Sequence, residues 1–155
     1  MTTEPTSPPP TRDGAADPLT VYLVEDSTII RDNLLALMHE TLPLTVMGSA
    51  SSETEALAAL RDGAAAADLV IVDIFLKDGS GLGVLAARHQ VAASGHWIVL
   101  TNHSTPDMRR KCLELGADAV FDKSNEIEAL LLYCKRLAGL DALGDARNSL
   151  EAALD

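Results

Sequence analysis

The stretch LVIVD at residues 69–73 decides the fold, because four consecutive apolar residues end at a carboxylate. A continuous apolar run of this kind is typical of a strand that is buried on both faces of a parallel sheet. Four further strands are expected, at residues 19–24, 44–48, 97–100 and 118–121, and Trp97 at the start of one of them is expected at a solvent or interface edge. Apolar residues at helical spacing separate the strands and predict helices that end at Pro43, Gly63, Val91, Gly116 and Leu137. Five strands alternating with five helices predict the α/β class, with a five-stranded parallel sheet covered by helices on both faces.

The 155 residues fit one domain of ordinary size, which we place at residues 19–138. Residues 1–18 are rich in proline and predict a disordered or polyproline-like tail. Leucines at three- and four-residue steps predict an extra amphipathic C-terminal helix over residues 139–155. This helix either packs on its own domain or forms a homodimer or partner contact, and the pattern leaves both alternatives open.

The charge balance limits the partners of the chain. Twelve Lys and Arg residues against 23 Asp and Glu residues give a formal net charge of −11. That balance argues against binding to nucleic acid, whose phosphates reward clustered basic residues, and against docking on an anionic membrane. The N-terminus lacks a signal-peptide pattern, and the two cysteines, Cys112 and Cys134, fit a reducing compartment. We therefore expect a cytoplasmic protein that contacts other proteins.

Polar side chains follow four of the five predicted strands. Glu25 and Asp26 come after the first strand, Asp73 after the third, Thr101 after the fourth and Lys123 after the fifth. In an open α/β sheet, ligands bind outside the carboxyl ends of the strands. We therefore expect three carboxylates, one hydroxyl and one ammonium to converge at this edge.

The convergence of these groups points to one kind of chemistry. Three adjacent carboxylates repel one another unless a cation is present, and hard oxygen ligands at a partly hydrated site suit Mg²⁺. A hydroxyl and an ammonium facing the metal suit the oxygens of a phosphoryl group. An aspartate at such a site can act as the nucleophile and form an acyl phosphate. The residues therefore predict Mg²⁺-dependent phosphorylation of an aspartate.

Four segments in register carry a resemblance to a known family: residues 21–26, residues 69–81, residues 99–101 and residues 120–123. In this order and spacing the chain resembles the response-regulator receiver domain of bacterial two-component systems, over roughly residues 19–138. The resemblance implies a flavodoxin-like (βα)5 three-layer sandwich and a role in phosphorelay signalling. Because no output domain is expected after residue 138, the sequence predicts a stand-alone response regulator.

The resemblance also assigns roles to the polar residues. Asp73 would be the phosphoacceptor, receiving a phosphoryl group from a histidine kinase or a phosphotransfer protein. Thr101 would hydrogen-bond the phosphoryl group and Lys123 would pair with it. The Mg²⁺ ligands would be Glu25, Asp26, Asp73 and the backbone carbonyl of Phe75. Phosphorylation would switch contacts with a downstream protein partner, so the chain would not be an enzyme beyond its own phosphoryl transfer and dephosphorylation.

Several positions depart from the pattern of the family. Val120 stands where the family commonly has an aromatic residue, which rotates inward on activation as part of a switch with the threonine. The neighbouring Phe121 faces the opposite side of the strand. Ser124 follows the lysine where the family often has proline after a cis bond, so here the bond is either trans or held cis by its surroundings. Phe75 and His103 occupy places that tune dephosphorylation, which predicts an altered lifetime of the phosphoryl group.

Two other functions remain as alternatives. A phosphatase of the haloacid-dehalogenase type also uses an aspartate nucleophile with Mg²⁺, but its motif needs a second Asp where this chain has Phe75. A DNA-binding transcription regulator needs a further basic domain of about 60 residues, which we do not expect after residue 138.

Overall fold

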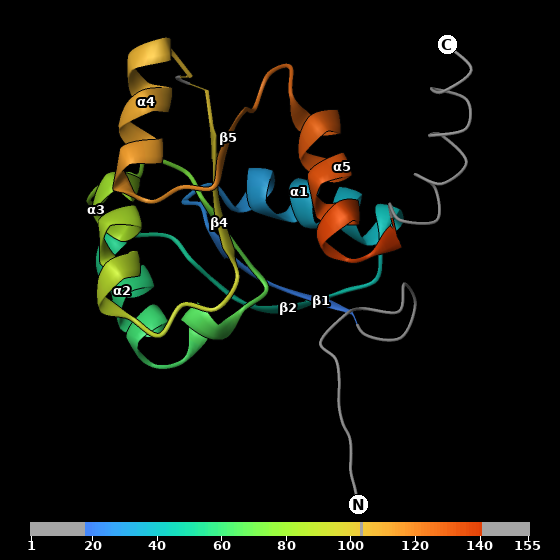
Figure 1. Cartoon of the computed structure of the whole chain (residues 1–155), viewed down its shortest axis with the longest axis horizontal. Coiled ribbons are helices and arrows are strands. Elements are labelled where there is room, and N and C mark those ends of the chain that lie inside the picture. The colour runs from blue at the N-terminus through green and yellow to red at the C-terminus, as the bar shows by residue number, and fades with distance from the viewer. Residues whose placement is uncertain (1–17, 103, 141–155) are drawn as a thin grey trace, which may run out of the picture.

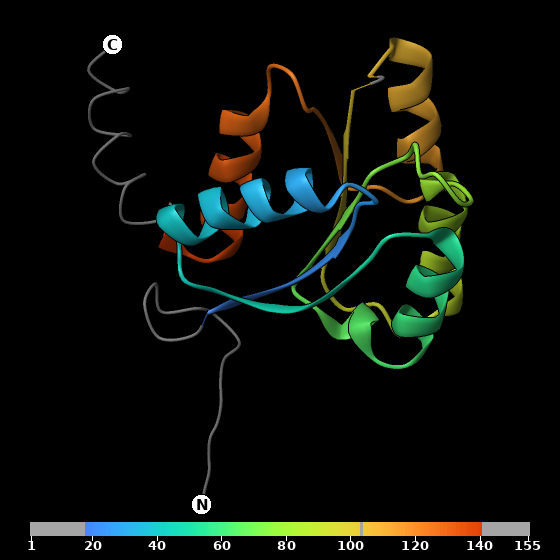
Figure 2. The same ribbon diagram turned by 180° about the vertical axis from the view of Figure 1, so that it is seen from behind.

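The computed structural model describes residues 18–102 and 104–140, and its centre is a parallel sheet of five strands in the order β2-β1-β3-β4-β5. Figure 1 shows this sheet between two groups of helices, and Figure 2 shows the same layers from behind. The strands are β1 (Leu19–Val24), β2 (Leu44–Ala50), β3 (Leu69–Val72), β4 (His96–Thr101) and β5 (Ala119–Asp122). The predicted α/β architecture with a parallel sheet is therefore confirmed.

Five α-helices connect and cover the strands. They are α1 (Thr28–Thr41), α2 (Glu53–Arg61), α3 (Gly81–Ala86), α4 (Pro106–Leu115) and α5 (Ile127–Leu137). Helices α1 and α5 lie on one face of the sheet, and α2, α3 and α4 lie on the other (Figure 1). The strand order reverses between β1 and β3, which is where such folds place their ligands.

Alternation along the strands divides the core into two apolar clusters. In β3, Leu69 and Ile71 face α1 and α5, whereas Val70 and Val72 face α2, α3 and α4. All four of these side chains are fully buried, as expected for a strand covered on both faces. The apolar run at residues 69–72 therefore contributes side chains to both halves of the core.

Local sequence signals explain how the helices begin and end. The side chains of Ser27, Ser52 and Thr105 accept hydrogen bonds from backbone N–H groups in the first turns of α1, α2 and α4. Pro106 occupies the first turn of α4, where its missing N–H costs nothing. Gly116 ends α4 in the left-handed region at φ 118°, which a residue without a side chain adopts readily.

Two details differ from the sequence-based predictions. Trp97 was expected at a solvent or interface edge, but it is fully buried in β4 and packs in the cluster beneath α3 and α4. The third helix was expected to run to Val91, but α3 ends at Ala86 and continues as a 3-10 helix at Ala87–Gln90. Trp97 is buried because its side chain lies on the face of β4 that α2, α3 and α4 cover.

Several expectations fall partly or wholly outside the described residues. The predicted tail over residues 1–18 and the predicted C-terminal helix over residues 139–155 are of this kind, and His103 is another. At the end of the described chain, Leu140 packs against the cluster beneath α1 and α5. Within residues 18–102 and 104–140, no helix is both long enough and apolar enough to cross a bilayer. The same ranges contain no cis peptide bond, so Lys123 and Ser124 are joined by a trans bond.

Candidate functional site

The carboxyl ends of β1, β3, β4 and β5 meet at one pocket of about 180 Å³. All six residues predicted for the site line it, and they are Glu25, Asp26, Asp73, Phe75, Thr101 and Lys123. The backbone ladder fixes the places of the first residues after the strands. The N–H of Asp73 donates to the carbonyl of Val24 at 2.9 Å, and the N–H of Lys123 donates to the carbonyl of Thr101 at 2.9 Å.

Lys123 lies between two buried carboxylates. Its Nζ is 2.7 Å from Glu25 Oε1 and 3.0 Å from Asp73 Oδ2. The side chains of Lys123, Glu25 and Asp73 are only 11%, 4% and 8% exposed. Charge-assisted hydrogen bonds with so little water around them are stronger than their surface equivalents. Lys123 therefore holds the ends of β1, β3 and β5 in one arrangement.

The same contacts shift the ionisation of the site. Burial raises the pKa of Glu25 above its ordinary value, although hydrogen bonds from Lys123 and from the N–H of Ser27 oppose the shift. Burial lowers the pKa of Lys123, but its hydrogen bonds to Glu25 and Asp73 outweigh that effect and the net shift is upward. Lys123 is consequently protonated at neutral pH and remains a cation facing the carboxylates.

The three carboxylates also form a group that fits a metal ion. One carboxylate oxygen from each of Glu25, Asp26 and Asp73 lies within 4.8 Å of the others. Asp26 Oδ2 is fixed by the N–H of Lys77 at 2.6 Å, and Asp73 Oδ1 is approached by the N–H of Phe75 at 3.3 Å. An ionised carboxylate keeps further acceptor capacity after one such bond. Three carboxylates beside a single ammonium form an acidic pocket of hard oxygen ligands, which suits Mg²⁺.

Thr101 and Phe75 border this acidic group in different ways. Thr101 is fully buried at the end of β4 and lines the pocket. Phe75 lies on the loop after β3, its side chain is 48% exposed, and its residue lines the same pocket. A buried threonine and a half-exposed phenylalanine thus both line the pocket that contains Asp73.

The close packing of the turn after Asp73 explains why it contains glycine. Gly81 packs so close to the end of β3 that a Cβ there would lie 2.1 Å from the carbonyl oxygen of Asp73. The N–H of Gly81 donates to the carbonyl of Ile74 at 2.8 Å, and the side chain of Glu53 accepts from the N–H of Ser80 at 2.8 Å. The turn therefore packs directly against the backbone at Asp73 and Ile74, and only glycine fits at residue 81.

Sequence reasoning missed two backbone contacts that hold the acidic residues. The N–H of Ser27 donates to Glu25 Oε2 at 3.0 Å, and the N–H of Lys77 donates to Asp26. These donors are backbone N–H groups, which no side-chain motif in the sequence can indicate. The position of Ser27, immediately before α1, was the available signal, because N–H groups point toward anions there.

The two residues that depart from the family pattern on β5 lie on opposite faces of the sheet. Val120 packs in the cluster beneath α2, α3 and α4, together with Met108 of α4. Phe121 packs on the other face, where its ring meets Tyr133 of α5 at 5.6 Å between centroids. Among the described residues, the side of β5 that faces α4 therefore carries a small aliphatic side chain in place of an aromatic ring.

Comparisons with known proteins agree with this arrangement. The family model of the response regulator receiver domain matches residues 21–135. The nitrate/nitrite response regulator protein homolog of Haemophilus influenzae is 26% identical over 122 residues, which cover 79% of this chain and 58% of that protein. The DNA-binding transcriptional activator DevR/DosR of Mycobacterium tuberculosis is 29% identical over 97 residues, which cover 63% of this chain and 44% of that protein.

A solved structure shows the same fold. The response regulator receiver domain protein (CheY-like) from Methanospirillum hungatei aligns with a TM-score of 0.68 at 24% identity, covering 81% of this chain and 98% of that one. The likeness supports the predicted flavodoxin-like arrangement of five strands and five helices. The chain spans about half the length of the curated relatives it matches.

Proposed function

Because this chain belongs to the response regulator receiver domain family, we propose that it is a signalling module switched by phosphorylation of Asp73. The observation that carries the proposal is the convergence of three carboxylates, Lys123 and Thr101 in one pocket at the carboxyl edge of the sheet. In two-component systems, receiver domains interact with histidine kinases or with phosphotransfer proteins. The donor proposed here is a histidine kinase or a phosphotransfer protein.

The proposed step is a transfer of one phosphoryl group. A carboxylate oxygen of Asp73 attacks the phosphorus of a phosphohistidine, a new P–O bond forms, and the P–N bond breaks. The electron pair of that bond stays on the imidazole nitrogen, which can take up a proton. The product is an acyl phosphate at Asp73, and its later attack by water returns the carboxylate and inorganic phosphate.

The neighbouring residues would position and stabilise that group. Lys123, already 3.0 Å from Asp73 Oδ2, would pair with a phosphoryl oxygen, and the Thr101 hydroxyl would donate a hydrogen bond to another. Glu25, Asp26, Asp73 and the backbone carbonyl of Phe75 would hold Mg²⁺. When bound, Mg²⁺ supplies positive charge that offsets the charge of the phosphoryl oxygens.

The downstream contact is proposed to be a protein. The net charge of −11 is unfavourable for this domain to bind nucleic acid directly. One relative is named as a DNA-binding activator, and it matches this chain over 44% of its own length. The stand-alone organisation predicted from the sequence stays a prediction, and the size of the natural protein on an immunoblot would test it.

Intact-mass measurement after incubation with acetyl phosphate and Mg²⁺ tests the proposal. We expect the wild type to gain the mass of one phosphoryl group and Asp73→Asn to gain none. Asp78→Asn is the matched control, because Asp78 is an exposed aspartate on the same loop. An adduct on Asp73→Asn equal to that of the wild type, or no adduct on the wild type, would contradict the proposed function.

A further inference from the structure

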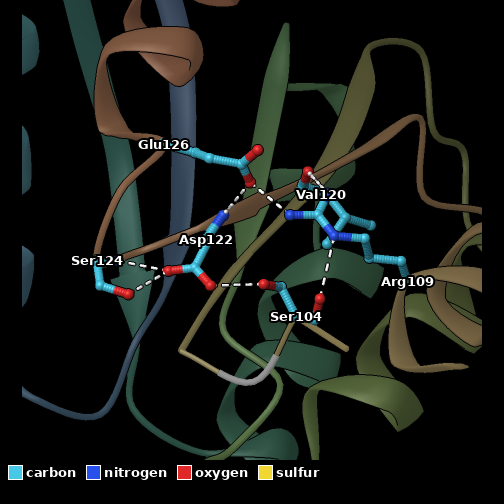
Figure 3. A network of polar contacts seen from close by, with 6 residues as sticks. All are labelled: Ser104, Arg109, Val120, Asp122, Ser124 and Glu126. Atoms are coloured by element: carbon cyan, nitrogen blue, oxygen red, sulfur yellow. Dashed lines mark hydrogen bonds and ion pairs between the residues drawn. The ribbon is translucent and has the colours of Figure 1, made fainter. Parts of the chain in front are cut away.

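A cluster of polar contacts joins α4 to the residues on both sides of Lys123 in the sequence, and Figure 3 shows its members. It comprises six residues, which we call the Arg109 network: Ser104, Arg109, Val120, Asp122, Ser124 and Glu126. These residues come from four segments, namely the loop before α4, α4 itself, β5 and the loop before α5. The network therefore joins α4 to the part of the chain that carries Lys123.

Arg109 is the centre of the network and uses all of its guanidinium nitrogens. Its Nε donates to the carbonyl of Ser104 at 3.1 Å, its Nη1 to the carbonyl of Val120 at 3.0 Å, and its Nη2 to Glu126 Oε1 at 2.5 Å. The planar fork of an arginine can hold three acceptors in a fixed geometry, which a single ammonium cannot do. One side chain of α4 thus fixes the distance between three other segments.

The two carboxylates of the network hold the residues on both sides of Lys123. Asp122 Oδ2 accepts from the Ser104 hydroxyl at 2.5 Å, and Asp122 Oδ1 accepts from the N–H and the hydroxyl of Ser124. Glu126 Oε1 accepts from the N–H of Asp122 at 2.8 Å in addition to Arg109. Asp122 and Ser124 flank Lys123 in the sequence, so Lys123 cannot shift its backbone without disturbing these contacts.

Both carboxylates stay ionised at neutral pH. The hydrogen bonds from Ser104 and Ser124 lower the pKa of Asp122 to about 2. The hydrogen bond from Arg109 and that from the N–H of Asp122 hold the pKa of Glu126 below its ordinary value. The network therefore keeps its charges near pH 7, and protonation of its carboxylates does not rearrange it there.

Near Val120, the contacts between β5 and α4 are of two kinds. The small side chain of Val120 lies in the same apolar cluster as Met108 of α4, and its backbone carbonyl accepts a hydrogen bond from Arg109 of α4. The aromatic ring of β5 belongs to Phe121, which faces α5. On the α4 side of β5, the most directional link is therefore the guanidinium of Arg109.

We propose that Arg109, held by Glu126, is the positioning residue that transmits phosphorylation of Asp73 to α4, and this inference rests on the proposed function. Lys123 and Thr101 are the residues expected to close on the phosphoryl group. A shift of Lys123 displaces Asp122 and Ser124, and a shift of Thr101 displaces Ser104 three residues later. Both displacements end at contacts of the Arg109 network, so α4 responds to the state of Asp73.

Hydrogen–deuterium exchange of the backbone amides in α4 tests this inference. Each protein is measured with and without acetyl phosphate and Mg²⁺, and its phosphorylation is followed in parallel by intact mass. The variants are Arg109→Met, Arg109→Lys and Glu126→Gln. The matched control is Arg110→Met, because Arg110 lies next along α4, its side chain is 65% exposed, and it forms an ion pair with Asp107 of the same helix.

We expect phosphorylation to change exchange in α4 of the wild type and of Arg110→Met, and to change it at least fivefold less in Arg109→Met. Arg109→Lys should restore part of that response, whereas a residue that only supports the fold would not affect the difference between the two states. Glu126→Gln keeps an acceptor for the N–H of Asp122 but loses the charge, so it should reduce the response even if Arg109→Met fails to fold.

Two results would overturn the inference while leaving the proposed function intact. One is a wild type that is phosphorylated at Asp73 without any change of exchange in α4. The other is a response in Arg109→Met and Glu126→Gln that equals that of Arg110→Met. If the wild type gains no phosphoryl group at all, the proposed function fails first and this inference fails with it.

Discussion

Replacing Lys123 with methionine removes the cation between Glu25 and Asp73 but keeps an aliphatic side chain of similar length. In the wild type, Lys123 Nζ lies 2.7 Å and 3.0 Å from the two carboxylates. Removing one partner of a buried ion pair leaves an uncompensated charge and costs ~3–5 kcal/mol. Two carboxylates would remain here, so the loss should lie in this range unless the protein takes up a proton.

Proton uptake sets a ceiling on that loss. Protonating one glutamate at pH 7 costs about 3.7 kcal/mol, since each unit between its ordinary pKa and the pH is about 1.36 kcal/mol. At pH 5 the same step costs about 1 kcal/mol. We therefore expect Lys123→Met to lose about 3 kcal/mol of unfolding free energy at pH 7 and about 1 kcal/mol at pH 5.

The sign follows from proton binding. In the variant, burial and the neighbouring carboxylate raise the folded-state pKa of Glu25, so the native state binds more protons than the unfolded state. Stability then falls as the pH rises above the unfolded-state pKa. The wild type should show a smaller loss, because Lys123, whose own pKa is raised, stays charged throughout that range and opposes the upward shift of the Glu25 pKa.

Urea denaturation at pH 5 and pH 7, with and without Mg²⁺, measures these effects. Lys111→Met is the control, because Lys111 is exposed and its replacement should change stability by less than about 0.5 kcal/mol. Mg²⁺ should stabilise Lys123→Met more than the wild type, since the metal supplies the missing positive charge. A loss that is the same at both pH values, or no larger than that of Lys111→Met, would refute the reasoning.

Four further predictions concern other parts of the site and the core. Gly81→Ala should lose ~1–3 kcal/mol in urea denaturation, because its Cβ would lie 2.1 Å from the Asp73 carbonyl oxygen; wild-type stability would speak against that close approach. Asp26→Asn should weaken Mg²⁺ binding at least ~10-fold by calorimetry, whereas unchanged affinity would remove Asp26 from the ligand set. Phe75→Asn should change the lifetime of the phosphoryl group on Asp73, followed by loss of the mass adduct with time, and equal decay rates would dismiss a tuning role. Trp97, the only tryptophan, should emit as a buried indole and resist acrylamide quenching, and a readily quenched signal would contradict its place in the core.

The sequence predicted the central pocket because parallel strands place their carboxyl ends at one edge. Asp73 and Lys123 are 50 positions apart in the chain, yet each lies just after a strand. Once the strands were identified, the sheet rule brought the two residues together without any knowledge of side-chain geometry. The same rule placed Glu25 and Asp26 beside them.

The Arg109 network could not be predicted in this way. Arg109, Asp122 and Glu126 lie on different segments, and their meeting depends on which face of α4 turns toward β5. Neighbouring Arg110 has the same chemistry but points to solvent, where it pairs with Asp107. One residue of rotation along a helix thus separates a connecting arginine from an ordinary surface charge, and no composition or motif signals the difference.

The misplacement of Trp97 has a simpler cause. Its neighbours Ile98, Val99 and Leu100 form a continuous apolar run, which already indicated a strand covered on both faces. Trp97 stands at the start of the strand, but its side chain lies on the face that helices α2, α3 and α4 cover. In the structure Arg88 lies over the indole, 5.8 Å from the ring centroid.

The most direct test of the central claim locates the phosphoryl group on the wild-type chain. After incubation with acetyl phosphate and Mg²⁺, reduction with borohydride converts an aspartyl phosphate to homoserine, and peptide mass spectrometry identifies the modified position. We predict that the modification is found at Asp73 and that it disappears when Mg²⁺ is removed by a chelator. Modification at Asp26 or at another carboxylate in place of Asp73, or a yield that does not depend on Mg²⁺, would contradict the account.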